Sequence, residues 1–292
     1  MNAVIDEKAY AKLNLSLDVS KPRPDGYHDM RMIMQTVSLC DEIRIELNET
    51  HTVLAKSNFR YIPSDDRNLA VKAAKTYLSA LGMNNTGAVI HMDKTIPVGA
   101  GMAGGSSDAA AVLRGLNRHF GKPMSSEELL ALSEKIGSDV PFCVLGGTAL
   151  AEGRGEILTP LNPLPDCLMV ICKPEFSVST PELFKALDRI KLRVHPDTVG
   201  MMKALETNDL RQLCRRMYNV FEDVPDRRMN VVREIEQELK DAGAEGAIMT
   251  GTGSAVFGIF LPETEAAAEN VRAKLEKKYG FCTAVRPVVQ QL

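Results

Sequence analysis

The segment from Pro97 to Ser107 has the residue types and spacing of a phosphate-binding loop. It contains four glycines and two hydroxyl-bearing serines: Gly99, Gly101, Gly104, Gly105, Ser106 and Ser107. Glycine removes the Cβ atom where a backbone turns sharply or approaches a ligand closely. The small residues that follow predict a helix from about 106 to 119. The N-terminus of such a helix presents unpaired N–H groups and a positive dipole end, so we predict an anion site there.

The residues and predicted elements around the glycines exclude three known kinds of phosphate loop. Gly99-x-Gly101-x-x-Gly104 matches the dinucleotide fingerprint, but a second helix follows where that fold has a parallel strand ending in an acidic residue. The P-loop needs Lys after its last glycine, where this chain has Ser106. A protein-kinase loop lies between two strands rather than before a helix. A plain strand–helix connection, the simplest alternative, needs fewer small residues than this one has.

Two charged residues outside the loop are candidates for catalysis. Lys12 lies in a segment, residues 11–19, that alternates apolar and polar side chains and therefore predicts a strand. Lys12, Asn14, Ser16 and Asp18 would share its polar face, and Leu13, Leu15 and Leu17 its apolar face. A polar face of this kind lies in solvent or forms the floor of a cleft. Asp139 precedes a short apolar helix, where its simplest role is that of the N-cap.

Three aromatic or imidazole side chains lie in less regular surroundings. Tyr27 and His28 follow a cluster of Pro and Gly, residues 21–26, which predicts a loop between two strands. The simplest interpretation is that their rings are exposed. Phe184 lies in a predicted helix, residues 181–190, whose start has the Ser179-x-x-Glu182 pattern of a capping box.

The elements that must position these residues do not alternate regularly. Strands predominate in the first 60 residues, whereas helices are predicted over 68–81, 125–137, 229–242 and 263–279. This order predicts an α+β protein with antiparallel sheets. Because a chain of 292 residues exceeds the size at which one core usually stops growing, we predict two domains, residues 1–158 and 159–292.

Composition narrows the classes of partner. The chain has 35 Lys+Arg against 38 Asp+Glu, a net charge of −3 and a pI near 6.0, so neither nucleic acid nor an anionic membrane is expected as a partner. The longest uncharged stretch, residues 246–262, is too short and too polar to span a bilayer. Charged residues lie where a signal peptide needs an apolar run. The cysteines form no CxxC pair, so we expect reduced core thiols and a cytoplasmic protein.

The loop motif, Pro-x-Gly-x-Gly followed by Gly-Gly-Ser-Ser and an Ala-rich helix, resembles the central motif of the GHMP kinases. This family is named for galactose, homoserine, mevalonate and phosphomevalonate kinases. Further segments resemble one branch of it: residues 11–15 with 23–28, residues 137–142 with 146–156, and residues 249–254. The departures are small, with Met102-Ala103 in place of Leu-Gly, Asp108 in place of Asn and Ser138 in place of Ala.

This resemblance implies a fold and a set of roles. The N-terminal domain would resemble ribosomal protein S5 domain 2, and the C-terminal domain would be ferredoxin-like. ATP with Mg²⁺ would bind at Pro97, Gly99, Gly101, Gly104, Gly105, Ser106 and Ser107. Lys12 and Asp139 would form the catalytic pair. Asn14, Tyr27, His28 and Phe184 would bind the substrate, with the two aromatic rings stacking on a cytosine base.

The acceptor in that branch is the 2-hydroxyl of cytidylyl-methylerythritol, in non-mevalonate isoprenoid biosynthesis, and the enzyme would be a monomer or a homodimer. Two other functions remain open. A sister enzyme, such as a mevalonate-type kinase or the diphosphomevalonate decarboxylase, would be favoured by a basic pocket without the Tyr27-His28 loop. A nucleotide-binding protein without catalysis would lack Lys12 or Asp139, and this chain has both.

Overall fold

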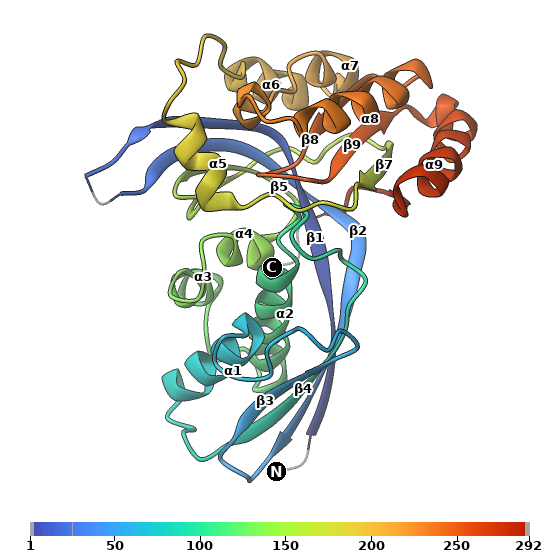
Figure 1. Cartoon of the computed structure of the whole chain (residues 1–292). Coiled ribbons are helices and arrows are strands. Elements are labelled where there is room, and N and C mark those ends of the chain that lie inside the picture. The colour runs from blue at the N-terminus through green and yellow to red at the C-terminus, as the bar shows by residue number, and fades with distance from the viewer. Residues whose placement is uncertain (1–2, 25, 290–292) are drawn as a thin grey trace.

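The computed structural model describes residues 3–24 and 26–289, which form two β-sheets with helices packed on them (Figure 1). Asp25, in the predicted loop, lies outside the described residues. The strands of the first sheet are β1 (Ala3–Pro22), β2 (His28–Asn48), β3 (Val53–Ser57), β4 (Gly87–Asp93), β5 (Thr148–Gly153) and β6 (Ile157–Pro160). Their order is β3-β4-β2-β5-β6, with β1 paired to β2. The second sheet has the order β10-β7-β9-β8, formed by β7 (Leu168–Lys173), β8 (Gly246–Met249), β9 (Val256–Phe260) and β10 (Phe281–Val285).

The helices are divided between the two sheets. One face of the first sheet is covered by α1 (Leu69–Ala80), α2 (Gly104–His119), α3 (Ser126–Glu134) and α4 (Val140–Leu145). The later helices are α5 (Thr180–Leu187), α6 (Thr198–Glu206), α7 (Leu210–Cys214), α8 (Met229–Asp241) and α9 (Glu265–Tyr279), with 3₁₀ turns at Val220–Asp223 and Pro262–Thr264. Of these, α8 and α9 pack on the second sheet. The α+β class is therefore confirmed.

One pairing corrects the expectation of purely antiparallel sheets. The strand β3, which its sequence pattern did not reveal, pairs parallel to β4, with Val53 opposite Ala88. The two strands are connected through α1, and a helical crossover is the connection that lets successive strands run in the same direction. The other strand pairs of the described residues are antiparallel.

Along the long strand β1, the side chains switch twice between the two faces of the sheet. Its register with β2 shifts between Tyr10 and Lys12 and again between Asn14 and Ser16. Before the first shift, Ala9 belongs to the core beneath the helices, and after it Ala11, Leu13 and Leu15 belong to a second core against the second sheet. Because side chains alternate across a strand, the shifts turn Lys12 and Asn14 toward the helices.

The same shifts correct the predicted faces of β1. Leu17 lies in the helix-covered core rather than with Leu13 and Leu15, so Ser16 and Asp18 do not share a face with Lys12. An alternating sequence gives no sign of a bulge, because the bulge changes pairing and not residue type.

The second core joins the two sheets. It packs β1 and β2 side chains such as Leu13 and Ile33 against Ile171 and Phe257 of the second sheet and Met201 of α6. The boundary predicted after residue 158 falls inside β6, a strand of the first sheet. The division into residues 1–158 and 159–292 therefore stays a prediction.

Two general expectations can be compared with the structure. None of the described helices combines the length and the apolar character that crossing a membrane requires. The six cysteines are free thiols, five of them buried, as expected for core residues.

A pair of carboxyl groups lies beside the second sheet. Glu222 accepts a hydrogen bond from the backbone N–H of Met249 at 2.8 Å, and its carboxyl group lies within hydrogen-bonding reach of Glu236. Burial, together with the neighbouring charge of Glu236, raises the pKa of Glu222 well above its ordinary value of 4.5. Glu222 therefore keeps a proton in the folded protein that it loses more readily in the unfolded chain.

This pair predicts a pH dependence of stability. Above about pH 4.5, Glu222 is protonated to a greater extent in the folded protein than in the unfolded chain. The contribution of Glu222 to the free energy of unfolding should therefore fall as the pH rises, by at most about 1.4 kcal/mol per pH unit. Glu222→Gln mimics the protonated side chain and should flatten this dependence. Urea unfolding at pH 5.5 and pH 8 measures the effect, and parallel pH profiles for the variant and the native protein would contradict it.

Candidate active site

The glycine-rich loop is held from one side by its carbonyl groups. The carbonyl of Ala100 accepts from the N–H of Ala255 at 3.2 Å, and that of Met102 accepts from the N–H of Lys12 at 3.2 Å. The carbonyl of Gly101, between them, accepts from the hydroxyl of Thr250 at 3.4 Å. Three successive carbonyl groups are therefore directed into the protein, toward β1 and the β8–β9 turn.

The N–H groups of the same loop have no partner in the described part of the chain. From residue 98 to residue 106 none of them donates a hydrogen bond, and the first to do so is that of Ser107, to the carbonyl of Ala103. Ala103, in the left-handed conformation at φ 58°, is the N-cap of α2, and its side chain makes no capping bond. Free N–H groups at the positive end of a helix dipole are the physical requirement of a phosphate site.

Close packing explains one of the glycines directly. A Cβ atom at Gly101 would lie 2.2 Å from the carbonyl oxygen of Thr250, and the φ of Gly101 is +76°. A side chain here would collide with backbone and would also strain the loop. Gly101 is therefore what lets the loop lie directly on the β8–β9 turn.

A cleft of about 350 Å³ opens beside the loop. Its walls include the loop itself and the apolar side chains Ile62, Pro63, Leu69 and Val98. An apolar slot next to an anion site suits a nucleotide base next to its phosphates. The residues around Ile62 were not identified from the sequence, because nothing in their types or spacing marks them.

Lys12 and Asn14 meet the β8–β9 turn at the edge of this loop. The Lys12 ammonium donates to the Asn14 side-chain oxygen at 2.5 Å, and both residues are buried. The backbone N–H of Asn14 donates to the Thr250 hydroxyl at 3.0 Å, and Thr250 in turn contacts Gly101. This chain of contacts links the predicted catalytic lysine to the phosphate loop.

Asp139 precedes α4 but does not cap it through its side chain. Its carboxylate makes no hydrogen bond or ion pair among the described residues, so the simplest structural role does not account for it. Burial raises the pKa of the Cys143 thiol to about 12, and the charge of Asp139 also raises it while that of Lys12 lowers it. Both charges thus act on one buried thiol, although no direct ion pair joins Lys12 to Asp139 in the described chain.

The predicted substrate residues come together around α5. The Phe184 ring lies 4.9 Å from the His28 ring at an interplanar angle of 32°. Asp188, four residues after Phe184, places its Oδ1 2.8 Å from His28 Nε2, which is hydrogen-bond distance. Positions i and i+4 share a helix face. Phe184 of α5 therefore packs on the face of the His28 ring, while Asp188, the C-cap of α5, contacts one nitrogen of that ring. Asp188 was not singled out from the sequence.

Tyr27 is 54% exposed, with the guanidinium of Arg154 over its ring at 5.3 Å. Gly155, next to Arg154, lies against Ser138, where a Cβ atom would be 3.7 Å from the carbonyl oxygen. The turn at residues 153–155 therefore joins the Tyr27 loop to the segment that carries Asp139.

The structure contradicts the sequence interpretation at Ser179 and confirms the one at the turn from Gly251 to Ser254. The capping box predicted at Ser179 is wrong, because its side chain makes no capping bond to α5. The turn from Gly251 to Ser254 does connect two antiparallel strands, β8 and β9. It is also held by a residue that carries no sequence signal, Asn219, whose amide donates to the carbonyls of Met249 and Gly251 at 2.8 Å each.

The described residues contain no group of three or more His, Cys, Asp or Glu side chains placed to hold a metal ion. Mg²⁺ bound with a nucleotide needs less than this, because it keeps several waters and takes its other oxygens mainly from the phosphates. The Ser106 hydroxyl, on the wall of the cleft, is an oxygen of the required kind beside the phosphate site.

Comparison with known proteins identifies the class. The model for the GHMP kinases N terminal domain matches residues 68–147, and the model for the GHMP kinases C terminal domain matches residues 201–280. The first range contains the phosphate loop and Asp139. The chain therefore belongs to the GHMP kinases, which are small-molecule kinases.

Full-length relatives define the branch. A Caldicellulosiruptor saccharolyticus protein named 4-diphosphocytidyl-2-C-methyl-D-erythritol kinase is 44% identical over 268 residues, 92% of each chain. A Geobacillus kaustophilus protein of the same name is 44% identical over 279 residues, 95% of this chain and 94% of the relative. Within the GHMP kinases, the chain belongs with the 4-diphosphocytidyl-2-C-methyl-D-erythritol kinases.

Solved structures agree with this assignment. The crystal structure of a 4-(cytidine 5'-diphospho)-2C-methyl-D-erythritol kinase superimposes with a TM-score of 0.78 at 32% identity, covering 97% of this chain and 99% of that one. A homoserine kinase from Cytophaga hutchinsonii superimposes with a TM-score of 0.77 at 21% identity, covering 99% and 95%. The second likeness shows the fold alone. The two-domain GHMP kinase fold is thereby confirmed.

The packing of the loop predicts the effect of a single methyl group. Gly101→Ala should weaken ATP binding about tenfold or more, because the loop must move away from Thr250 and misplacement of about 1 Å has effects of that size. Gly121→Ala is the matched control, since Gly121 also has a positive φ but nothing within 4 Å of an added Cβ atom. Titration calorimetry measures both variants, and equal ATP affinities would contradict this role of Gly101.

Proposed function

We propose that the protein transfers the γ-phosphoryl group of ATP to the 2-hydroxyl of 4-diphosphocytidyl-2-C-methyl-D-erythritol, in the cytoplasmic non-mevalonate route to isoprenoids. The observation that carries the proposal is the row of unpaired N–H groups from residue 98 to residue 106. Lys12 is bonded to this loop through Met102, and the charge of Asp139 acts on Cys143, whose sulfur contacts the Ser107 hydroxyl. The names of the full-length relatives supply the acceptor.

ATP fits the cleft by its chemistry. The triphosphate would take hydrogen bonds from the loop N–H groups, including those at the Gly104 end of α2, and the base would lie in the apolar slot near Ile62 and Pro63. Mg²⁺ bound to the phosphates would neutralise the charge that develops on them, and the Ser106 hydroxyl is the oxygen this chain would offer it. Residues 1–158 would thus hold the nucleotide.

Asp139 and Lys12 would act on the acceptor hydroxyl. The Asp139 carboxylate, which has no partner among the described residues, is free to take the hydroxyl proton as the oxygen attacks. The Lys12 ammonium, held by Asn14, would supply positive charge beside the attacking oxygen and the phosphoryl group. Because Lys12 does not pair directly with Asp139, the substrate hydroxyl would lie between the two.

The cytidine end of the acceptor would bind where Tyr27, His28 and Phe184 gather. Arg154 lies over the Tyr27 ring at 5.3 Å, and the rings of Tyr27 and Phe184 would stack on the cytosine base. His28 Nε2 is held by Asp188, which leaves Nδ1 as the ring nitrogen for the base edge. This recognition site combines residues at the β1–β2 connection with Phe184 of residues 159–292. The acceptor would extend from this site to Asp139.

An acceptor panel tests the function. Release of ADP from ATP and Mg²⁺ should occur with the cytidylyl substrate and not with mevalonate or homoserine. Release with mevalonate alone would keep the kinase chemistry but contradict the assigned roles of Tyr27, His28 and Phe184. No release with any acceptor, while ATP still binds, would favour a nucleotide-binding protein without catalysis.

A paired variant separates chemistry from binding in the same assay. Asp139→Asn should retain ATP affinity and lose kcat by roughly 10²- to 10⁴-fold, the range for removal of a general base. Asp66→Asn is the control, because Asp66 forms only an exposed ion pair with Lys75 and should leave kcat unchanged. A kcat of Asp139→Asn within twofold of the native enzyme would remove Asp139 from the proposed mechanism.

A further inference from the structure

A buried cluster of three charged side chains lies beneath the phosphate loop and takes no part in the chemistry above. The Lys94 ammonium contacts Asp41 Oδ2 and Asp108 Oδ2 at 2.5 Å each. Side-chain exposure is 3% for Lys94, 0% for Asp41 and 4% for Asp108. We call these three residues the charged triad.

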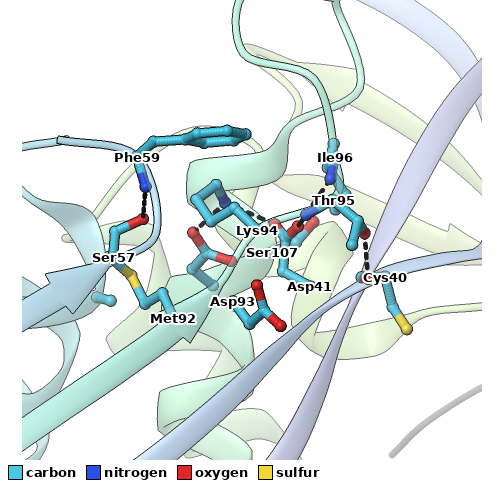
Figure 2. A network of polar contacts seen from close by, with 12 residues as sticks. Cys40, Asp41, Ser57, Phe59, Met92, Asp93, Lys94, Thr95, Ile96 and Ser107 are labelled. Carbon is cyan, nitrogen blue, oxygen red and sulfur yellow. Dashed lines mark hydrogen bonds and ion pairs between the residues drawn. The ribbon is translucent and has the colours of Figure 1, made fainter. Parts of the chain in front are cut away.

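The triad connects three elements that meet at the loop. Asp41 belongs to β2, Lys94 follows the end of β4, and Asp108 lies in the first turns of α2. The other oxygen of Asp41 accepts the backbone N–H groups of Thr95 at 2.6 Å and Ile96 at 2.8 Å. Figure 2 shows Asp41, Lys94, Thr95 and Ile96 in this network. The chain is therefore fixed on both sides of its entry into the loop at residue 97.

The triad also lies close to the start of α2. A Cβ atom at Gly104, the first residue of that helix, would be 3.7 Å from the Lys94 ammonium nitrogen and 3.2 Å from Ile96. Lys94 and Asp108 both line the nucleotide cleft. Movement of the Lys94 side chain would thus displace the N–H groups that the phosphates would contact.

Stability gives no sufficient reason for burying these charges. Replacing a buried ion cluster by apolar residues of similar volume is often neutral or stabilising, because removing charges from water is costly. Burial raises the pKa of Asp108 to about 7, an effect that the charge of Asp41 reinforces and that of Lys94 opposes. One carboxylate oxygen, Asp108 Oδ1, is buried without a hydrogen-bond partner among the described residues. The contribution of the cluster to folding stability therefore does not explain why these three charges are buried together at this place.

We propose that Asp41, Lys94 and Asp108 are positioning residues for the nucleoside triphosphate, which hold both ends of the phosphate loop in register and so set the affinity for ATP. Asp41 and Lys94 fix the strand side of the loop, and Asp108 fixes the helix side to the same ammonium group. The three residues act through residues 97–107 rather than by contact with the reacting atoms. This inference rests on the proposed nucleotide site but not on the identity of the acceptor.

The test uses Asp108→Ala, which removes both carboxylate oxygens and so releases the helix side of the loop from Lys94. Assays run at pH 8, well below the melting temperature of each variant. We expect the KM for ATP, and the ATP dissociation constant from titration calorimetry, to rise about tenfold, while the KM for the acceptor changes by less than twofold. Asp66→Asn, which breaks the exposed pair with Lys75, should change none of these values.

A lowered melting temperature with an unchanged KM and dissociation constant for ATP would overturn the proposal, because a merely structural cluster gives that result. Should Asp108→Ala not fold, the variant Asp41→Asn/Lys94→Met/Asp108→Asn replaces it. This variant carries no buried charge, and the amide oxygen that it places at position 41 can still accept from Thr95 and Ile96. If it folds and binds ATP as tightly as the native protein, the proposal is likewise wrong.

Failure of the triad proposal is distinguishable from failure of the proposed function. If the native protein phosphorylates no cytidylyl acceptor, titration of ATP into the native protein and Asp108→Ala still measures the triad's effect on nucleotide affinity. If the acceptor is phosphorylated and the two ATP affinities agree, only the triad proposal fails.

Discussion

The site depends on where the hydrogen-bonding groups of one loop are directed. Ala100, Gly101 and Met102 give their carbonyl groups to the protein, which leaves the N–H groups of residues 98–106 unpaired. A buried N–H group without a partner costs about 1–3 kcal/mol, so such a row persists only where water or an anion can reach it. The structure satisfies this condition by placing the loop on the wall of an open cleft.

Everything around the loop serves to hold its carbonyl side. The register shift after Tyr10 turns the Lys12 side chain toward the helices and coincides with the contact between the Lys12 N–H and Met102. The β8–β9 turn contributes Thr250, and Asn219 fixes that turn from behind. The same few contacts therefore place the phosphate site, the ammonium of Lys12 and the second sheet relative to one another.

The sequence predicted the parts of this arrangement that depend on local residue types. The glycine-rich loop that leads into a helix and the α+β order of elements both follow from local chemistry. The facing of Leu17, the parallel pairing of β3 with β4 and the apolar slot near Ile62 do not, because each depends on a partner distant in the chain.

The candidate site shows the same division. Residue type made Lys12 and Asp139 candidates for catalysis, and the family resemblance supplied phosphoryl transfer and their roles in it. Nothing local marked Asp188, Asn219, Asp41 or Lys94, and Asp108 was noted only as a departure from the family motif. Asp, Asn and Lys are ordinary surface residues, so their types gave no sign of burial. Their importance comes from contacts between residues that lie 14 to 160 positions apart.

Hydrogen exchange of the loop amides tests the central claim most directly. Without nucleotide, the N–H groups of residues 98–106 should exchange at close to unprotected rates, whereas those of α2 beyond Ser107 should be protected by helical hydrogen bonds. ATP with Mg²⁺ should slow exchange across residues 98–106 by about tenfold or more, as the phosphates become their acceptors. Protection of these amides before nucleotide is added, or exchange that ATP leaves unchanged, would contradict the account.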